Sequence, residues 1–199
     1  ATQNGLVKRI SLSSLLNISR EGSVVLGNKD SDFVVSVDIT NGDQDLLLAS
    51  SNGYIIRFSE TDVRDMGLQA GGVKGMEVAA GEKVVKMIAI QNNKSSLLTL
   101  TAFGFGKRSD LSEYGRIRRG GKGIINFKLS PKSGSVVSLL EIQKNESLLV
   151  TTLKGRTKKT KAKAIKVMGR ATQGIPVIKV AQKDELDQTI YLPEIKSEI

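Results

Sequence analysis

Short apolar runs, each bounded by turn-forming residues, recur along the chain. They are rich in aliphatic and β-branched side chains and span residues 46–50, 84–90, 97–101, 136–140 and 147–151. Runs of this length between turn formers are typical of strands, whereas helices need longer periodic segments. The best helical candidate, residues 60–66, is one or two turns long at most, and we expect a loop of 3₁₀ character there. The pattern therefore predicts an all-β chain.

A glycine-containing turn that leads into a short strand ending in a cation occurs four times. Its glycines are separated by 48, 51 and 51 positions and are Gly5, Gly53, Gly104 and Gly155. A second glycine motif follows in three of the repeats, at Gly75, Gly123 and Gly174, which are 48 and 51 positions apart. The equivalent stretch of the first repeat, residues 21–26, lacks the final glycine and the cation. We therefore expect the first repeat to bind anions least well.

These spacings predict four repeats, at about residues 1–45, 46–93, 94–145 and 146–180, followed by closure of the last strand and an acidic tail over residues 181–199. Four short strands in each repeat are typical of propeller-like arrays. Because one such repeat cannot bury its apolar face alone, neighbouring repeats must stack. The chain has no Trp, five Phe and three Tyr, so the cores of the repeats must be aliphatic. A β-sandwich with coincidentally spaced turns is the alternative.

Positive charge is concentrated in one part of the sequence. The 199 residues include 30 Lys and Arg against 20 Asp and Glu, a formal net charge of +10. Residues 101–180 carry 18 basic and 4 acidic side chains, a net of +14, whereas residues 1–100 sum to −1 and residues 181–199 to −3. A positive field confined to one segment indicates a surface for a polyanion. Solvated surface lysines are the alternative interpretation.

The residue types of most enzyme and metal sites are missing. The chain has no Cys and no His, which excludes disulfides, a thiolate nucleophile and the usual zinc sites. Packing best explains the three tyrosines, and turn capping best explains carboxylate pairs such as Asp43 with Asp45 and Asp62 with Asp65. We therefore expect no catalytic residue, no metal and no cofactor in this chain. No apolar run has the ~20 residues of a membrane span, so we expect a cytoplasmic protein without a membrane partner.

The most basic stretch, residues 115–123, holds four cations and four glycines in nine positions. Glycine allows the backbone to approach a ligand closely, and Arg and Lys donate hydrogen bonds that suit phosphate oxygens. We expect the repeated glycine and cation motifs to form a curved positive track that binds double-stranded DNA with little sequence preference. The candidate DNA-binding residues are Arg9, Arg57, Lys74, Lys107, Arg108, Arg116, Arg118, Arg119, Lys122, Lys154, Arg156, Lys158, Lys159, Lys161, Lys163 and Arg170.

Two other interpretations of these cations are open. A propeller scaffold that binds an acidic protein partner would share the charge and the repeats but needs no curved DNA. The lysines of residues 158–163 also suit a strand edge that is guarded against pairing with another chain.

Five short motifs in a fixed order give the chain a resemblance to a known family. They are residues 1–9, residues 53–58, residues 62–67 followed by 72–75, residues 104–108 followed by 113–114, and residues 168–174. Over residues 1–180 the chain resembles the C-terminal DNA-wrapping domain that ends the A subunit of bacterial DNA gyrase. The resemblance implies a β-pinwheel, a propeller-like array of about four four-stranded blades that exchange strands with their neighbours. These blades would be the later ones of a domain that commonly has six.

The resemblance also implies a role. DNA would bend around the basic rim and be presented to the strand-passage gate with one handedness, so that the enzyme introduces negative supercoils. The isolated domain would be monomeric and no enzyme by itself. Its partners would be double-stranded DNA, the rest of the gyrase A subunit, in which the domain lies, and the separate B subunit, while ATP and magnesium would bind elsewhere in the holoenzyme. The expected location is the bacterial cytoplasm, in association with the nucleoid.

Residues 118–123 are similar to the basic Gly-Gly hallmark of gyrase, but Ile117 stands where the hallmark has Gln. The stretch also lies in the third repeat present rather than in the first blade. The equivalent domain of topoisomerase IV, which selects DNA for decatenation or relaxation, is therefore an alternative. The acidic tail suggests a further hypothesis, in which its carboxylates fold back on the basic rim and compete with DNA. These carboxylates are Asp184, Glu185, Asp187, Glu194 and Glu198.

Overall fold

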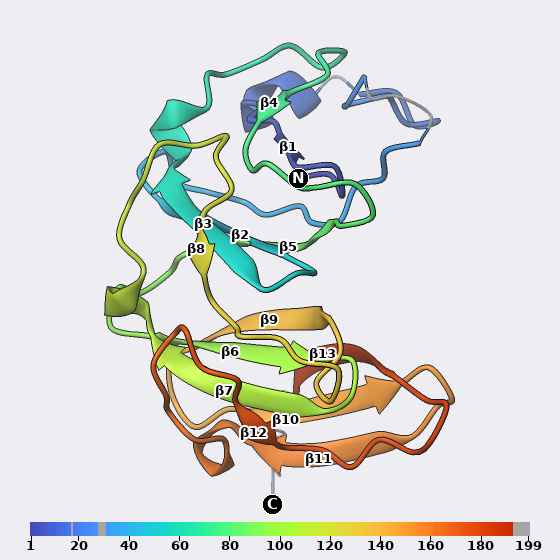
Figure 1. The fold of residues 1–199 in the computed structure, drawn as a ribbon. Coiled ribbons are helices and arrows are strands. Elements are labelled where there is room, and N and C mark those ends of the chain that lie inside the picture. The colour runs from blue at the N-terminus through green and yellow to red at the C-terminus, as the bar shows by residue number, and fades with distance from the viewer. Residues whose placement is uncertain (17, 28–30, 193–199) are drawn as a thin grey trace, which may run out of the picture. The chain divides into compact units, whose positions relative to one another are not determined.

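The computed structural model describes residues 1–16, 18–27 and 31–192, and this part of the chain is all-β, as predicted. Its thirteen strands form four sheets (Figure 1). The helices of the described ranges are four short 3₁₀ turns: η1 (Leu12–Leu15), η2 (Glu60–Asp62), η3 (Leu111–Glu113) and η4 (Ala162–Ala164). η2 lies where a loop of 3₁₀ character is predicted. No helix in this part of the chain is long and apolar enough to cross a membrane.

Two of the sheets have four strands each. One has the order β5 (Val84–Ala89), β2 (Asp45–Ser50), β3 (Tyr54–Ser59) and β8 (Ile124–Ile125). The other has the order β12 (Ile175–Pro176), β7 (Phe105–Asp110), β6 (Ser96–Thr101) and β9 (Val136–Ile142). The apolar runs of the sequence form β2, β5, β6 and β9 of these sheets, which confirms the strand prediction for them.

The other two sheets have two and three strands in the described part of the chain. β1 (Leu6–Val7) pairs only with β4 (Val73–Lys74) among the named strands. β10 (Ser147–Thr152), the fifth predicted run, lies between β11 (Thr157–Lys161) and β13 (Leu186–Leu192) in a sheet of three strands.

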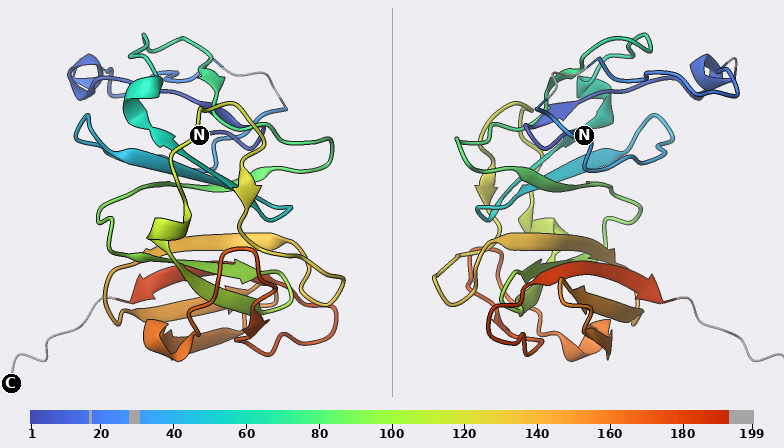
Figure 2. Two further views of the ribbon diagram at one scale, coloured as in Figure 1. Left: turned by 60° about the vertical axis from the view of Figure 1, so that its left-hand side comes forward. Right: turned by 90° about the vertical axis from the view of Figure 1, so that its right-hand side faces the viewer.

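The described residues between η1 and β2 form no strand and follow a long loop, drawn in blue in Figure 2. Side chains of this loop cover the outer edge of β5. Ser36 Oγ accepts a hydrogen bond from the N–H of Met87, and Asp38 Oδ2 accepts one from the N–H of Ala89, both at 3.0 Å. These side chains accept the hydrogen bonds that the backbone carbonyl groups of a neighbouring strand would otherwise accept. The loop therefore pairs the N–H groups at the edge of β5 without adding a strand to the sheet.

Three of the sheets receive a two-residue strand from the next repeat. β4 pairs with β1, β8 with β3, and β12 with β7. At each joint the carbonyl oxygen of the glycine before the receiving strand accepts two N–H groups. Gly5 accepts from Gly75 and Met76 at 2.8 and 3.1 Å, and the same contact recurs at Gly53 and Gly104. The exchange of strands between neighbouring repeats, which the family resemblance implies, is therefore present.

The joints also show which glycines are equivalent in the second motif. Gly123 and Gly174 have φ angles of +82° and +70°, and the residue that matches them is Gly72 at +84°. A Cβ on any of these three would lie between 2.2 and 2.8 Å from a backbone oxygen of the receiving strand. They are spaced by 51 and 51 positions. The predicted alignment with Gly75 is wrong, because Gly75 lies three positions later and donates its N–H to Gly5 instead.

The chain folds as two compact units. The first holds residues 55–91, 115–124 and the described residues of 1–50, and the second holds residues 51–54, 92–114 and the described residues from 125 onward. In the first unit the largest buried aliphatic side chains include Leu47, Leu48, Ile55 and Ile56, none of which is exposed to solvent. The core of the second unit is also mainly aliphatic, as predicted, and it includes Leu98, Leu100, Leu148, Val150, Ala162 and Ile165.

Candidate nucleic-acid interface

The basic loop at residues 115–123 is fixed by its backbone in the first compact unit. The N–H of Ile117 donates to the carbonyl of Arg57 at 2.8 Å, and the N–H of Gly120 donates to Gly75 at 2.7 Å. The carbonyl of Gly121 accepts from Glu77 at 3.0 Å. These three contacts use main-chain groups, so they fix the course of the loop backbone independently of its side chains.

A buried carboxylate holds two of the arginines at this loop. Asp45 Oδ2 lies 2.6 Å from Arg57 Nη2, and Asp45 Oδ1 lies 2.5 Å from Arg116 Nε. The Asp45 side chain is 3% exposed, Arg57 12% and Arg116 59%. The hydrogen bond and charge of Asp45 raise the pKa of Arg116. Arg57 is therefore a structural residue, whereas Arg116 is anchored at its base and open to solvent.

The other cations of the loop differ in how much they are used by the fold. Arg119 Nε donates to the carbonyl of Asp62 at 2.8 Å, and its Nη1 donates to the carbonyl of Lys74 at 2.9 Å. Arg118 and Lys122 are exposed. An open hollow of about 800 Å³ lies here, lined by Asp43, Ser59, Thr61, Asp62 and residues 116–119. The loop thus presents fixed guanidinium groups beside a space that is open to solvent.

Arg170 repeats the role of Arg119 in the second compact unit. Its Nη1 donates to the carbonyl of Ile125 at 2.8 Å, and its N–H donates to Glu113 Oε2 at 2.8 Å. Arg119 and Arg170 are 51 positions apart, and so are the carbonyls of Lys74 and Ile125 that they contact. Each arginine therefore contacts the two-residue strand of the preceding joint, β4 for Arg119 and β8 for Arg170. Lys74 lies in the donated strand β4 itself, so its position is not equivalent to that of these arginines.

Lys107 does not belong to the predicted positive track of DNA-binding residues, because it lies in the core. Its side chain is completely buried, and Nζ donates to Ser109 Oγ at 2.8 Å, to Gly169 O at 2.9 Å and to Arg170 O at 2.7 Å. Nζ also lies 5.8 Å from the centre of the Phe127 ring. Burial lowers the pKa of Lys107 to about 8. A buried ammonium group that already donates three hydrogen bonds within the protein cannot contact a DNA phosphate. The assignment of Lys107 as a DNA contact is therefore wrong.

The arginines of the first glycine motif are also partly used by the fold. Arg108 Nε donates to Ile165 O at 2.9 Å, and its Nη1 lies 3.5 Å from Ser96 Oγ. Arg9 is partly buried and lines a hollow in the first unit. Sequence reasoning grouped these side chains with the exposed cations because the sequence does not show which side of a short strand faces inward.

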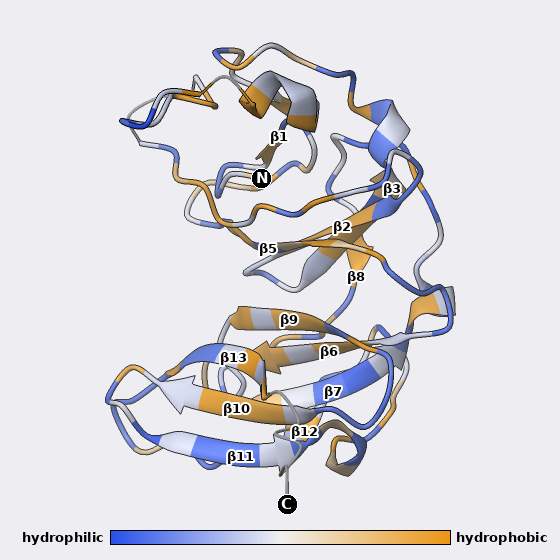
Figure 3. Cartoon of the chain, turned by 180° about the vertical axis from the view of Figure 1, so that it is seen from behind, coloured by the Kyte–Doolittle hydropathy of each residue, from blue (hydrophilic) through white to orange (hydrophobic). Residues whose placement is uncertain are grey.

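A second group of cations lies on and around β11. Six of the predicted residues are exposed there, and they are Lys154, Arg156, Lys158, Lys159, Lys161 and Lys163. β11 is blue and its neighbour β10 is largely orange in Figure 3, in keeping with an exposed polar strand beside a buried apolar one. Lys158 Nζ contacts Val177 O at 3.1 Å, and no such contact is described for the other five side chains. This group is the largest set of exposed cations that the structure brings together.

The hypothesis about the acidic tail is wrong for Asp184. This residue is 4% exposed, and its Oδ1 accepts from the N–H groups of Lys154 and Glu185 at 3.1 and 2.9 Å. A carboxylate fixed in a turn cannot fold back on the basic surface. Glu194 and Glu198 lie outside the described residues.

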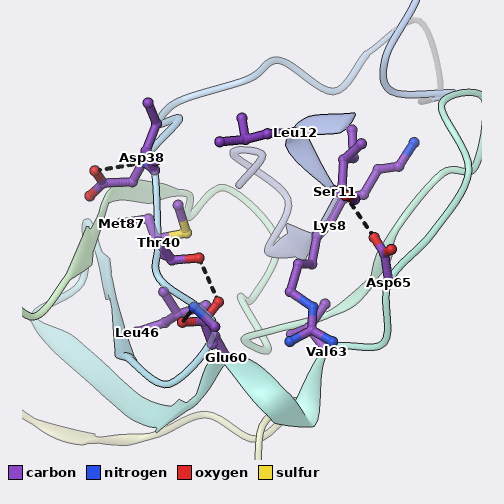
Figure 4. A pocket seen from close by; sticks show the side chains of 14 residues that line it. Lys8, Ser11, Leu12, Asp38, Thr40, Leu46, Glu60, Val63, Asp65 and Met87 are labelled. Atoms are coloured by element: carbon purple, nitrogen blue, oxygen red, sulfur yellow. Dashed lines mark hydrogen bonds between the residues drawn. The ribbon is translucent and has the colours of Figure 1, made fainter. Parts of the chain in front are cut away.

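A separate hollow of about 390 Å³ lies in the first unit (Figure 4). Its carboxylates are used by the protein. Glu60, 2% exposed, accepts from Thr40 Oγ1 and from two backbone N–H groups, and Asp65 accepts from the N–H of Ser11 at 3.0 Å. Because these carboxylates accept hydrogen bonds from the protein itself, the hollow is explained by structure rather than by a ligand. The described residues hold no cluster of three or more acidic side chains that suits a metal.

Comparison with known proteins agrees with this architecture. The model of the DNA gyrase C-terminal domain, a beta-propeller, matches residues 1–41, 44–91, 95–143 and 146–189. The A subunit of DNA gyrase from Escherichia coli K12 is 33% identical over 186 residues, which are 94% of this chain and 21% of that protein. Its counterpart from Staphylococcus epidermidis ATCC 12228 is 35% identical over 181 residues, 90% of this chain and 20% of that protein. The chain thus spans about a fifth of the length of these relatives.

Solved structures show the same similarity. A DNA gyrase A C-terminal domain superposes with a TM-score of 0.87 at 26% identity, covering 97% of this chain and 64% of the other. The C-terminal domain of a DNA topoisomerase IV superposes with a TM-score of 0.89 at 25% identity, covering 96% of this chain and 60% of the other. The family match covers four consecutive segments, and the strand exchange between repeats agrees with it. The chain therefore belongs to the DNA gyrase C-terminal domain family.

Proposed function

We propose that the chain binds double-stranded DNA without sequence preference and bends and wraps it over its exposed cations. The observation that best supports this is the loop at residues 115–123. Its backbone is anchored at Ile117, Gly120 and Gly121, while Arg118 and Lys122 are left exposed. Cations held on a fixed backbone lose less conformational entropy when they bind phosphates. The second compact unit has its own group of exposed cations on and around β11, and no described element resembles a recognition helix.

The energies are compatible with bending. Smoothly bending a site of 20 to 30 base pairs costs roughly 1 to 6 kcal/mol. Each phosphate that is neutralised releases condensed counterions, which lowers the slope of log K against log salt by about 0.9. The exposed cations of the loop and of β11 can supply several such contacts, enough to offset the cost of a bend.

In the whole enzyme, we propose that this wrap directs strand passage so that DNA gyrase introduces negative supercoils. The domain would then work with the rest of the A subunit, with the B subunit, and with ATP and magnesium bound elsewhere, in the bacterial cytoplasm. The relatives described above, which come from DNA gyrase, favour this assignment. The similar superposition on a topoisomerase IV domain keeps DNA selection for decatenation or relaxation as the second candidate.

The test is equilibrium binding of a labelled duplex of mixed sequence, by fluorescence anisotropy at several KCl concentrations. The loop variant combines Arg118→Ala with Lys122→Ala. If both residues contact phosphates, the slope of log K against log salt becomes less negative by about 1.8 and affinity at about 100 mM KCl falls roughly tenfold or more. The matched control, Arg20→Ala with Lys94→Ala, removes the same charge from exposed positions outside the basic loop and β11.

Equal salt slopes for the loop variant and the control would contradict the proposed interface. An acidic peptide that binds as tightly as duplex DNA would instead favour a scaffold for an acidic protein. A peptide of polyglutamate is a suitable probe because it carries charge without the spacing of a DNA backbone.

A further inference from the structure

The turn between β6 and β7 carries an exposed aromatic side chain. Phe103 is 42% exposed, and its N–H donates to the carbonyl of Ser133 at 3.0 Å. The residues at the same position of the other repeats, directly before the receiving glycine, are polar, and they are Asn4, Asn52 and Lys154. An aromatic ring at this position is therefore particular to the third repeat.

A glycine holds one edge of this ring. Gly134 has a φ of +70°, and a Cβ there would lie 3.1 Å from Cδ2 and 3.2 Å from Cε2 of Phe103. A larger residue in place of Gly134 would therefore crowd the ring. Because the backbone supports one edge of the ring while much of its surface meets solvent, Phe103 offers a flat apolar surface at a fixed place.

The ring borders an open hollow of about 620 Å³ in the second compact unit. Its lining comes from three segments, which are Phe103, residues 131–132 and residues 180–185. Leu186, directly after the last of these, pairs with Thr152, whereas Leu192 pairs with Ser147 at the other end of β10. β13 therefore leads away from the hollow.

Two lysines line the hollow at equivalent positions of neighbouring repeats. Lys132 and Lys183 are 51 positions apart and exposed, and each is the third residue of a turn that an N–H to carbonyl hydrogen bond closes. The preceding repeat has Gly81 there, at a φ of +81°, and Lys183 keeps a φ of +60°. Lysine is disfavoured in this conformation. The turn thus places a cation where a glycine would fit with less strain.

A second pair of lysines repeats with the same spacing. Lys128 and Lys179 lie four positions before Lys132 and Lys183, and both are exposed. Each directly follows the residue that donates the second N–H group at a joint, so the two positions are equivalent in the structure as well. None of the four lysines belongs to the predicted positive track. They stand on and beside a hollow whose described lining has one exposed acid, Glu185.

We propose that this hollow binds single-stranded DNA, with an unpaired base stacked on Phe103 and the flanking phosphates on Lys132 and Lys183. Proteins that bind single strands combine cations along the backbone with aromatic rings on which bases stack. An acidic peptide would engage the lysines but would leave the ring without a partner. The proposal does not rest on the proposed function, because it concerns another ligand and other residues.

The first test uses fluorescence, because the chain has no Trp and Phe103→Trp introduces a single one beside the hollow. The probe is an oligothymidylate of about 12 nucleotides, and we expect it to quench this Trp as a base stacks on the indole. An abasic oligonucleotide of equal length and charge should quench much less. Ile190→Trp, at a position of β13 that is 50% exposed, is the matched control and should not respond.

The second test measures affinity for the labelled oligothymidylate by fluorescence anisotropy. Phe103→Ala should weaken binding about tenfold or more, and Phe103→Tyr should restore it because the ring is kept. Lys132→Gln combined with Lys183→Asn should make the slope of log K against log salt less negative by about 1.4. Asn is used at position 183 because it tolerates positive φ. Circular dichroism checks that the variants fold.

A duplex of mixed sequence separates this proposal from the proposed function. Phe103→Ala should leave duplex binding unchanged, whereas the loop variant Arg118→Ala with Lys122→Ala tests the duplex surface alone. Equal quenching by the abasic oligonucleotide, or equal affinity of Phe103→Ala and the unaltered chain for oligothymidylate, would overturn the single-strand site. Equal losses for oligothymidylate and duplex would overturn it too, since Phe103 would then be a contact for paired DNA.

Discussion

The buried lysine of β7 makes the stability of the protein depend on pH in an unusual direction. Lys107 is completely buried, and burial lowers its pKa from 10.5 to about 8. In the unfolded chain the lysine keeps its proton to about pH 10.4. Between these values the folded state binds fewer protons than the unfolded state, so the free energy of unfolding rises with pH. The cost of burying the charge is fully present below pH 8 and is relieved above it.

The size of this effect follows from the difference between the two pKa values. Each pKa unit corresponds to about 1.4 kcal/mol, so the protein should gain about 1.4 kcal/mol from Lys107 between about pH 7 and about pH 9. Measurements should stop there, because burial raises the pKa of Tyr114 and its titration acts in the opposite sense at higher pH. The buried terminal amine of Ala1 also has a lowered pKa and contributes with the same sign as Lys107.

Urea unfolding followed by far-ultraviolet circular dichroism at pH 7, 8 and 9 measures this gain. Comparison with Lys107→Met removes the contribution of Ala1, which both proteins share. Lys107→Met should be less stable at pH 7, because Gly169 O and Arg170 O lose a donor, and its gain by pH 9 should be smaller by about 1.4 kcal/mol. Lys158→Met, at the same position of the last repeat but exposed, should keep the gain of the unaltered protein. Equal gains for Lys107→Met and the unaltered chain would refute the argument.

Two other predictions concern the joints and the buried carboxylate. Gly104→Ala places a Cβ 2.1 Å from Ile178 O and should cost at least about 2 kcal/mol more than Gly155→Ala, which shares the positive φ but meets nothing within 4 Å. Urea midpoints compare the two, and equal losses would mean that the joint is not tightly packed. Asp45→Asn leaves Arg57 without its carboxylate and should cost about 2 kcal/mol by the same assay, while it frees Arg116. A loss no larger than that of Asp43→Asn, an exposed acid in a nearby turn, would contradict this role for Asp45.

The sequence predicts most of the fold because strand formation here is local. Runs such as residues 46–50 and 97–101 are aliphatic, short and bounded by turns, and both form strands. The receiving glycines Gly5, Gly53 and Gly104 are also visible, because a tight backbone contact tolerates no side chain at those positions. The absence of a strand in the described residues between η1 and β2 is not predictable in this way. There the loop contacts the edge of β5 through the side chains of Ser36 and Asp38 rather than through backbone pairing.

The candidate site is harder to predict because exposure is set by tertiary contacts. Lys107 and Lys158 occupy the same position of successive repeats, yet one is buried and the other exposed. The difference arises because Lys107 meets the carbonyls of Gly169 and Arg170, which a later segment supplies. Asp45 gives no repeated signal either, since Ser96 stands 51 positions later and cannot pair with two arginines.

The central proposal is that the chain wraps DNA, and a change of linking number tests it most directly. Nicked circular DNA is sealed by ligase with increasing amounts of the chain bound, the protein is removed, and the topoisomers are separated on a gel. Wrapping of one handedness predicts a linking difference that grows with bound protein, and the variant Arg118→Ala with Lys122→Ala should shift it less at equal concentration. A topoisomer distribution identical to that of DNA sealed without protein, at concentrations that saturate binding, would contradict wrapping.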